Sequence, residues 1–152
     1  MSIRNLDSLF DPASVVVIGA SDRPARVGST VWHNLRHGSY GGTLMAVNPK
    51  YRQLDDLPVV ARVQDLPTTP ELAVICTPPA TVPGLIDDLG AMGTRAAIVM
   101  TAGFTPAHKQ AMLDAARRHL LRILGPNCLG LLAPHIGLNA SFSHVPATAG
   151  SL

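Results

Sequence analysis

Small residues around two glycines near the N-terminus could bind an anion. Gly19 ends an apolar, β-branched run, and Val27, Gly28 and Ser29 stand where a helix is expected to begin. Free amides at the start of a helix, together with the helix dipole, favour a phosphate or a pyrophosphate. Ser21 occupies the place of the second glycine of a G-x-G-x-x-G motif, and the loop before Gly28 is longer than in that motif. A plain turn without a ligand is the alternative.

The segment Asn48-Pro49-Lys50 ends a second apolar run and presents a cation. A dinucleotide fold that holds a ribose diol needs a carboxylate at this point, and the sequence has none. Lys50 instead suits an anionic group on the ribose, as in NADP or the 3′-phosphate of coenzyme A (CoA). A solvated surface lysine is the alternative, although Lys50 is one of only two lysines in an arginine-rich chain.

Two later loops suit the less polar parts of a nucleotide ligand. Thr77-Pro78-Pro79 follows a third apolar run, and its prolines leave a stiff edge suited to the face of an adenine. Ala102 and Gly103 follow a fourth run beside Phe104 and would line a narrow groove for an extended chain. An ordinary connecting loop is the alternative in both places.

Asn127 and Cys128 lie in a turn rich in glycine, where an amide could contact a reacting carbonyl. A catalytic thiol needs a partner base, and the sequence shows no Cys–His pair, so Cys128 is expected to be a packed small residue. No catalytic residue is predicted. Cys128 and Cys76 have no metal-ligand spacing and are typical of reduced thiols in a cytoplasmic protein.

His33 and His37 have the i, i+4 spacing that two metal ligands on one helix would have. No third ligand stands at a suitable spacing, so we expect two surface histidines and no metal site.

Five apolar runs alternate with helical patterns and would position these loops. The runs span residues 14–19, 43–47, 72–76, 96–100 and 121–124, and the helical patterns span 27–38, 82–92 and 105–119. Uniformly apolar strands indicate a parallel sheet covered on both faces. We therefore predict a three-layer α/β, Rossmann-like domain with a mostly parallel sheet of five strands or slightly more. Right-handed crossovers would bring the carboxyl end of every strand, and so every candidate loop, to one edge.

The composition excludes several classes of protein. A chain of 152 residues with 47% hydrophobic and 14% charged residues can form one globular domain. The net charge of +2, with no basic stripe, argues against a nucleic-acid partner. No apolar run approaches the roughly 18 residues that a membrane span needs, so no membrane partner is expected.

The order and spacing of these segments resembles the CoA-binding domain shared by NDP-forming acyl-CoA synthetases and the succinyl-CoA synthetase alpha subunit. The resemblance covers essentially the whole chain, and its matching segments are 17–21 with 27–29, 47–50, 101–104 and 125–130. Residues 137–143 and 4–6 look most like the bacterial protein-lysine acetyltransferases, which join this scaffold to a GNAT acetyltransferase domain.

This resemblance implies an ordered set of contacts with CoA or acetyl-CoA. The phosphates would meet Ser21, Gly28 and Ser29, and the ribose 3′-phosphate would meet Lys50. The adenine would lie beside Thr77, Pro78 and Pro79. The pantetheine arm would pass Ala102 and Gly103, and the thiol would face Asn127 and Cys128. Gly19, Val27, Asn48 and Pro49 complete the predicted site.

The resemblance also implies a domain organisation. Residues 1–152 would be a CoA-binding domain from a longer multidomain chain, with 131–152 as a tail leading into the next domain. A phosphohistidine and ATP or ADP would belong to other domains of the same protein, so this part would bind CoA or acyl-CoA and do no chemistry alone. An NADP-binding oxidoreductase domain and a stand-alone CoA-binding regulatory module are the alternatives.

Overall fold

A seven-stranded sheet forms the centre of the molecule in a computed structural model that describes residues 3–150. Its order is β3-β4-β2-β1-β5-β6-β7, and every pairing in it is parallel except that of β3 with β4. The strands are β1 (Ser14–Ile18), β2 (Thr43–Val47), β3 (Gln53–Leu54), β4 (Leu57–Val60), β5 (Leu72–Ile75), β6 (Ala96–Val99) and β7 (Arg122–Leu124). The predicted fold class is confirmed, and the five predicted strands are β1, β2, β5, β6 and β7.

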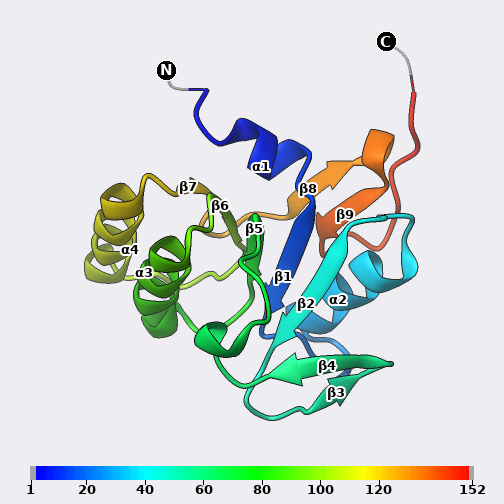
Figure 1. Cartoon of the computed structure of the whole chain (residues 1–152), viewed down its shortest axis with the longest axis horizontal. Coiled ribbons are helices and arrows are strands. Elements are labelled where there is room, and N and C mark those ends of the chain that lie inside the picture. The colour runs from blue at the N-terminus through cyan, green and yellow to red at the C-terminus, as the bar shows by residue number, and fades with distance from the viewer. Residues whose placement is uncertain (1–2, 151–152) are drawn as a thin grey trace.

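Helices cover both faces of this sheet (Figure 1). They are α1 (Leu6–Phe10), α2 (Val27–His37), α3 (Val82–Met92) and α4 (Pro106–His119), with single 3₁₀ turns at Val63–Asp65, Pro79–Thr81 and Pro134–Ile136. The three longer helices were predicted, and α1 was not. Thr105 caps α4, because its hydroxyl accepts a hydrogen bond of 3.1 Å from the amide of His108. No helix in residues 3–150 is long and apolar enough to cross a lipid bilayer.

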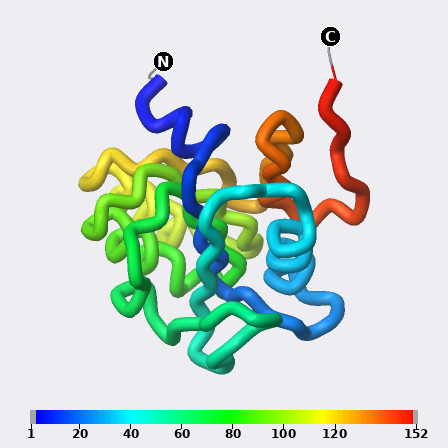
Figure 2. Tube along the Cα trace, turned by 45° about the vertical axis from the view of Figure 1, so that its right-hand side comes forward, coloured from blue at the N-terminus to red at the C-terminus, as the bar shows by residue number. Residues whose placement is uncertain are grey.

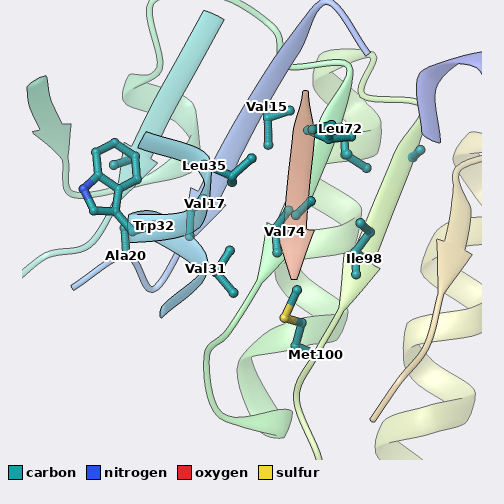
Figure 3. Packing of buried hydrophobic residues seen from close by; sticks show 14 of the residues in the cluster. Val15, Val17, Ala20, Val31, Trp32, Leu35, Leu72, Val74, Ile98 and Met100 are labelled. Carbon is teal, nitrogen blue, oxygen red and sulfur yellow. The ribbon is translucent and has the colours of Figure 1, made fainter. Parts of the chain in front are cut away.

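The core lies in two layers, one on each side of the sheet. Alternate residues of the central strands point to opposite faces, so Val15 and Val17 pack with α2 while Val16 packs with α3 and α4. Val31 and Leu35 of α2 reach the strands on their side (Figure 3). Burial on both faces is the reason that the strand sequences are uniformly apolar.

A second, two-stranded sheet completes the layer of α2. It pairs β8 (Gly130–Ala133) with β9 (Leu138–Ser141), and the chain after β9 continues beside α2 (Figure 2). Asn34 of α2 donates hydrogen bonds of 2.9 and 3.0 Å to the carbonyls of Ser141 and Ser143. Leu138 and Ala140 are fully buried. The interval 131–152, which we expected to be a tail, therefore begins with a hairpin that packs into this domain, and residues 151–152 lie outside the described part.

Candidate functional site

One cavity of about 920 Å³ opens at the carboxyl ends of β1, β2 and β5. This size is within the range of ligand sites in proteins. Nine of the fifteen predicted site residues line it: Gly19, Ser21, Val27, Gly28, Asn48, Pro49, Lys50, Thr77 and Pro78.

The two glycines of the first loop let the start of α2 approach the end of β1. A Cβ on Gly28 would lie 2.0 Å from the carbonyl oxygen of Gly19, and Gly19 itself has a φ of +90°. The amides of Ser29 and Thr30 donate to the Arg26 carbonyl at 3.1 and 3.2 Å. Within residues 3–150, the amides of Val27 and Gly28 have no such acceptor, so they can donate to an anion in the cavity.

Ser21 lies at the wall of the cavity in a hydrogen-bond network. The residue as a whole is only 8% exposed. The Ser21 hydroxyl oxygen lies 3.0 Å from the Tyr51 hydroxyl and accepts a hydrogen bond of 3.0 Å from the amide of Arg23. The Tyr51 hydroxyl donates to a carboxylate oxygen of Asp22 at 2.7 Å. This network joins the loop after β1 to the loop after β2.

Asn48 forms a second link between the same two loops. Its side-chain nitrogen donates to the carbonyl of Ala20 at 2.8 Å, and its side-chain oxygen accepts from the amide of Lys50 at 2.9 Å. Both polar atoms of the Asn48 side chain are therefore engaged within the protein. Its evident effect is to fix the turn that carries Lys50.

Positive charge gathers around the cavity. Lys50, Arg23, Arg26 and Arg62 line it, together with one carboxylate from α3, Asp88. Arg62 forms an ion pair of 2.9 Å with Asp65, whereas no ion pair in the described residues includes the other three cations. The cavity is thus suited to an anionic ligand.

The remaining six predicted residues do not line this cavity. Ser29 faces a second cavity of about 800 Å³ on the other side of the first loop, and its hydroxyl donates to the Arg23 carbonyl. The other five line neither cavity: Pro79, Ala102, Gly103, Asn127 and Cys128.

The loops after β6 and β7 are nevertheless joined to the cavity through Thr77. The hydroxyl of Thr101 donates to the Thr77 carbonyl at 2.6 Å, and the amide of Asn127 donates to the Thr101 carbonyl at 3.0 Å. The side chain of Asn127 is exposed, as are Ala102 and Gly103. These residues therefore lie on the same edge of the sheet as the cavity.

Neither cysteine has the environment of a nucleophile. Burial, and to a smaller degree the proximity of Cys128, raises the pKa of the Cys76 thiol to about 12. Burial also raises the pKa of Cys128, whose sulfur lies 3.5 Å from the Val99 carbonyl oxygen. Both thiols are protonated near neutral pH, and a protonated thiol is a poor nucleophile.

His33 and His37 are exposed on α2, with ring centroids 4.6 Å apart, and they line the second cavity with His144. In the described part of the chain, no three His, Cys, Asp or Glu side chains gather as a metal ion would require.

Tyr51 and two arginines of the first loop also line the cavity of about 920 Å³, and we did not predict them from the sequence. Tyr51 directly follows Lys50, and Arg23 and Arg26 stand between Gly19 and Gly28. The arginines of the chain are spread along its whole length, which hides the pair in the first loop. A count restricted to the loops that follow the predicted strands would have found three cations at one edge.

Known proteins resemble this chain in both sequence and fold. It is 36% identical over 153 residues to acetate–CoA ligase (ADP-forming) I of Archaeoglobus fulgidus, covering 97% of this chain and 22% of the relative. It is also 36% identical over 138 residues to the ADP-forming acetate–CoA ligase of Methanocaldococcus jannaschii, covering 88% and 19%. The chain therefore spans about a fifth of the length of these ligases.

A solved structure, the dinucleotide-forming acetyl-coenzyme A synthetase 1 of Ca. Korarchaeum cryptofilum with phosphate and ADP, is 36% identical with a TM-score of 0.84. The match covers 90% of this chain and 30% of that one. The family model described as CoA binding domain matches residues 13–134, which include every strand of the seven-stranded sheet and the whole cavity. This chain belongs to the CoA-binding domain family.

Proposed function

We propose that the chain binds CoA or acyl-CoA in the cavity at the carboxyl edge, as the CoA-binding domain of an ADP-forming acyl-CoA synthetase. One observation carries the proposal. Lys50 shares a cavity with the glycine loop at the start of α2, while no carboxylate follows β2 to accept a ribose diol. A cation beside free helix amides suits a nucleotide with an extra phosphate on its ribose.

The arrangement suggests which part of CoA each group would meet. The pyrophosphate would accept hydrogen bonds from the amides of Val27 and Gly28, and the ammonium group of Lys50 would pair with the 3′-phosphate. Thr77 and Pro78 line the cavity where an adenine would lie. Arg23 and Arg26, which also line it, would add to the attraction for a polyanion.

The pantetheine arm would leave the cavity along the loops after β6 and β7. Ala102 and Gly103 would line its path, and Asn127 would approach the thiol end. Cys128 would serve there as a packed residue, since its pKa is raised. We propose that the chain only positions CoA, and that ATP or ADP and the acyl group are handled by other domains or subunits.

The relatives named above are ligases and a synthetase, which supports the synthetase class over the acetyltransferase class. The expected acetyltransferase context depends on residues 137–143 and 4–6 alone. In the structure residues 138–141 form β9, which packs on α2. Packing within this domain is therefore enough to explain the sequence of that stretch. The acetyltransferase context and the cytoplasmic location stay predictions.

A thermal-shift assay with CoA, acetyl-CoA, NADP and NAD tests the proposal. A ligand at 100 times its Kd stabilises the folded state by about 2.7 kcal/mol. We expect CoA and acetyl-CoA to raise the Tm and the two dinucleotides to leave it unchanged. A shift with NADP alone would favour the oxidoreductase alternative, to which the relatives give no support.

The substitution Lys50→Ala tests the position of the 3′-phosphate. We expect about a tenfold loss of affinity for CoA and little change for dephospho-CoA, as measured by calorimetry. Lys109→Ala is the matched control, because Lys109 is the other lysine of the chain and lies exposed on α4. An equal loss for both ligands would contradict the contact between Lys50 and the 3′-phosphate.

A further inference from the structure

The hydroxyls of Ser21 and Tyr51 form a hydrogen-bond chain with a fixed direction. An ionised carboxylate can only accept, so Tyr51 gives its single proton to Asp22. The hydrogen bond between Tyr51 and Ser21 must then use the proton of Ser21. The Ser21 oxygen in turn accepts from the amide of Arg23. The chain therefore runs from Arg23 through Ser21 and Tyr51 to the carboxylate of Asp22.

While this series of hydrogen bonds is intact, its direction excludes the predicted hydrogen bond from Ser21 to a phosphate. Its one proton is engaged with Tyr51, so it cannot also donate to a phosphate. The phenol proton at the end of the chain is the one directed at an anion. Tyr51 lines the proposed CoA cavity. Asp22, whose carboxylate accepts the hydrogen bond from the phenol, is exposed and lines only the second cavity.

We propose that Tyr51 is a CoA-binding residue whose hydroxyl exchanges the carboxylate of Asp22 for the pyrophosphate of the ligand. This inference rests on the proposed function and adds a residue to its site. Ser21 remains the donor to Tyr51 in both states and acts as a positioning residue. Asp22 competes with the ligand for the same hydrogen bond.

The surroundings of the three side chains favour such an exchange. Asp22 is exposed, so water can solvate its carboxylate once Tyr51 leaves it. Tyr51 is half-buried and its amide donates to the carbonyl of Asn48 at 3.3 Å, which keeps the phenol in place. The hydroxyl lies within hydrogen-bond distance of Ser21 and Asp22 in the loop after β1, where the pyrophosphate is proposed.

The test compares the affinities of Tyr51→Phe and Asp22→Ala for CoA and dephospho-CoA by calorimetry. Loss of a hydrogen bond to a charged group predicts about tenfold weaker binding of Tyr51→Phe. Loss of the competing acceptor predicts about threefold tighter binding of Asp22→Ala. Both changes should be the same for CoA and dephospho-CoA, in contrast to Lys50→Ala.

The double variant separates hydrogen-bond exchange from simple charge repulsion. In the Tyr51→Phe background there is no hydroxyl to release, so we expect Asp22→Ala to lose its effect. The same tightening in both backgrounds would mean that the Asp22 charge acts alone, which would overturn the inference.

Tyr40→Phe is the matched control for the tyrosine substitution. The Tyr40 hydroxyl donates to the Pro12 carbonyl at 2.7 Å, away from the cavity, so its loss should lower the Tm and leave the CoA affinity unchanged. If the unsubstituted protein binds CoA and Tyr51→Phe binds it with the same affinity, the inference about Tyr51 is overturned while the proposed function stands. No binding of CoA by the unsubstituted protein would overturn the proposed function instead.

Discussion

The loops after β1, β2 and β5 differ from the loops after β6 and β7, although all five follow parallel strands of one sheet. The first three line a single cavity with three cations that have no ion pair in the described residues. The last two line neither cavity. In these two loops the Thr101 hydroxyl and the Asn127 amide donate hydrogen bonds to carbonyls of neighbouring loops.

The difference indicates which loops have polar groups free for an anionic ligand and which loops use them to hold one another in place. A donor that is bonded to a backbone carbonyl of the protein gains little by turning to a ligand, because the carbonyl then loses its partner. Tyr51 differs, because water can solvate the exposed carboxylate of Asp22 that it leaves. Unengaged amides and cations, by contrast, give up only water when they bind an anion, and a charge-assisted hydrogen bond is the stronger of the two. The half of the edge near β1 therefore offers an anion more free donors and cations than the half near β7 does.

The largest expected difference between the halves is the reactivity of the two cysteines. Cys76 follows β5 and has a pKa of about 12 in place of the usual 9.0, so its thiolate fraction at pH 8 is about a thousandfold lower. We expect iodoacetamide to modify Cys76 more slowly than Cys128, and both more slowly than a free cysteine, as followed by mass spectrometry. Faster labelling of Cys76 than of Cys128 would break the comparison.

Substitution of glycine should affect binding more in the first half. In Gly28→Ala the new methyl group meets the Gly19 carbonyl at 2.0 Å, so the start of α2 must move away from β1. We expect a loss of stability of about 2–3 kcal/mol and about a hundredfold weaker CoA binding, measured by urea unfolding and calorimetry.

Gly103→Ala is the matched change in the second half. Nothing lies within 4 Å of its Cβ position, but its φ is +80°, so the strain costs about 1 kcal/mol of stability. Its effect on CoA affinity should be several times smaller than that of Gly28→Ala. Equal losses of affinity would show that both halves of the edge bind the ligand equally.

The smallest effect on binding is expected from a polar cluster outside the edge. Asp87 of α3 contacts His119 at 2.8 Å and Arg118 at 2.9 Å on α4. Hydrogen bonds from His119 and then Arg118 lower the pKa of Asp87. A lowered folded-state pKa adds stability above the unfolded pKa, and this stability is lost as the pH falls through the folded value.

Asp87→Asn should therefore make the loss of stability below about pH 4 shallower, without changing CoA affinity at pH 7. Urea midpoints at pH 7 and pH 3 measure the first effect, and calorimetry measures the second. A weaker affinity in this variant would place part of the binding energy outside the loops.

The local hydrophobic pattern predicted most of the fold. The strands β1, β2, β5, β6 and β7 each belong to a nearly uninterrupted apolar run, and the helices α2, α3 and α4 each carry a repeating apolar face. The edge strands β3 and β4 have two and four residues, and β8 and β9 have four each. Length alone does not explain the difference, because β5 and β6 also have four residues and β7 has three. Each missed strand contains a polar, proline or glycine residue that interrupts an apolar run (Gln53, Pro58, Gly130 and Asn139), and its pairing depends on neighbours far along the chain.

The candidate site was only partly predictable for a related reason. The sequence determined which loops follow the strands, and so placed nine predicted residues at one cavity. The engagement of Asn48 with Ala20, and of Ser21 with Tyr51, was not readable, because each bond joins loops about thirty residues apart.

By itself, the sequence determined the order of strands and helices, the shared edge of the loops and the cation after β2, because these follow from local hydrophobic pattern and chain connectivity. Only the tertiary structure decided which hydroxyls and amides remain available to a ligand. That depends on the direction of each hydrogen bond across neighbouring loops, which is set when the sheet brings them together.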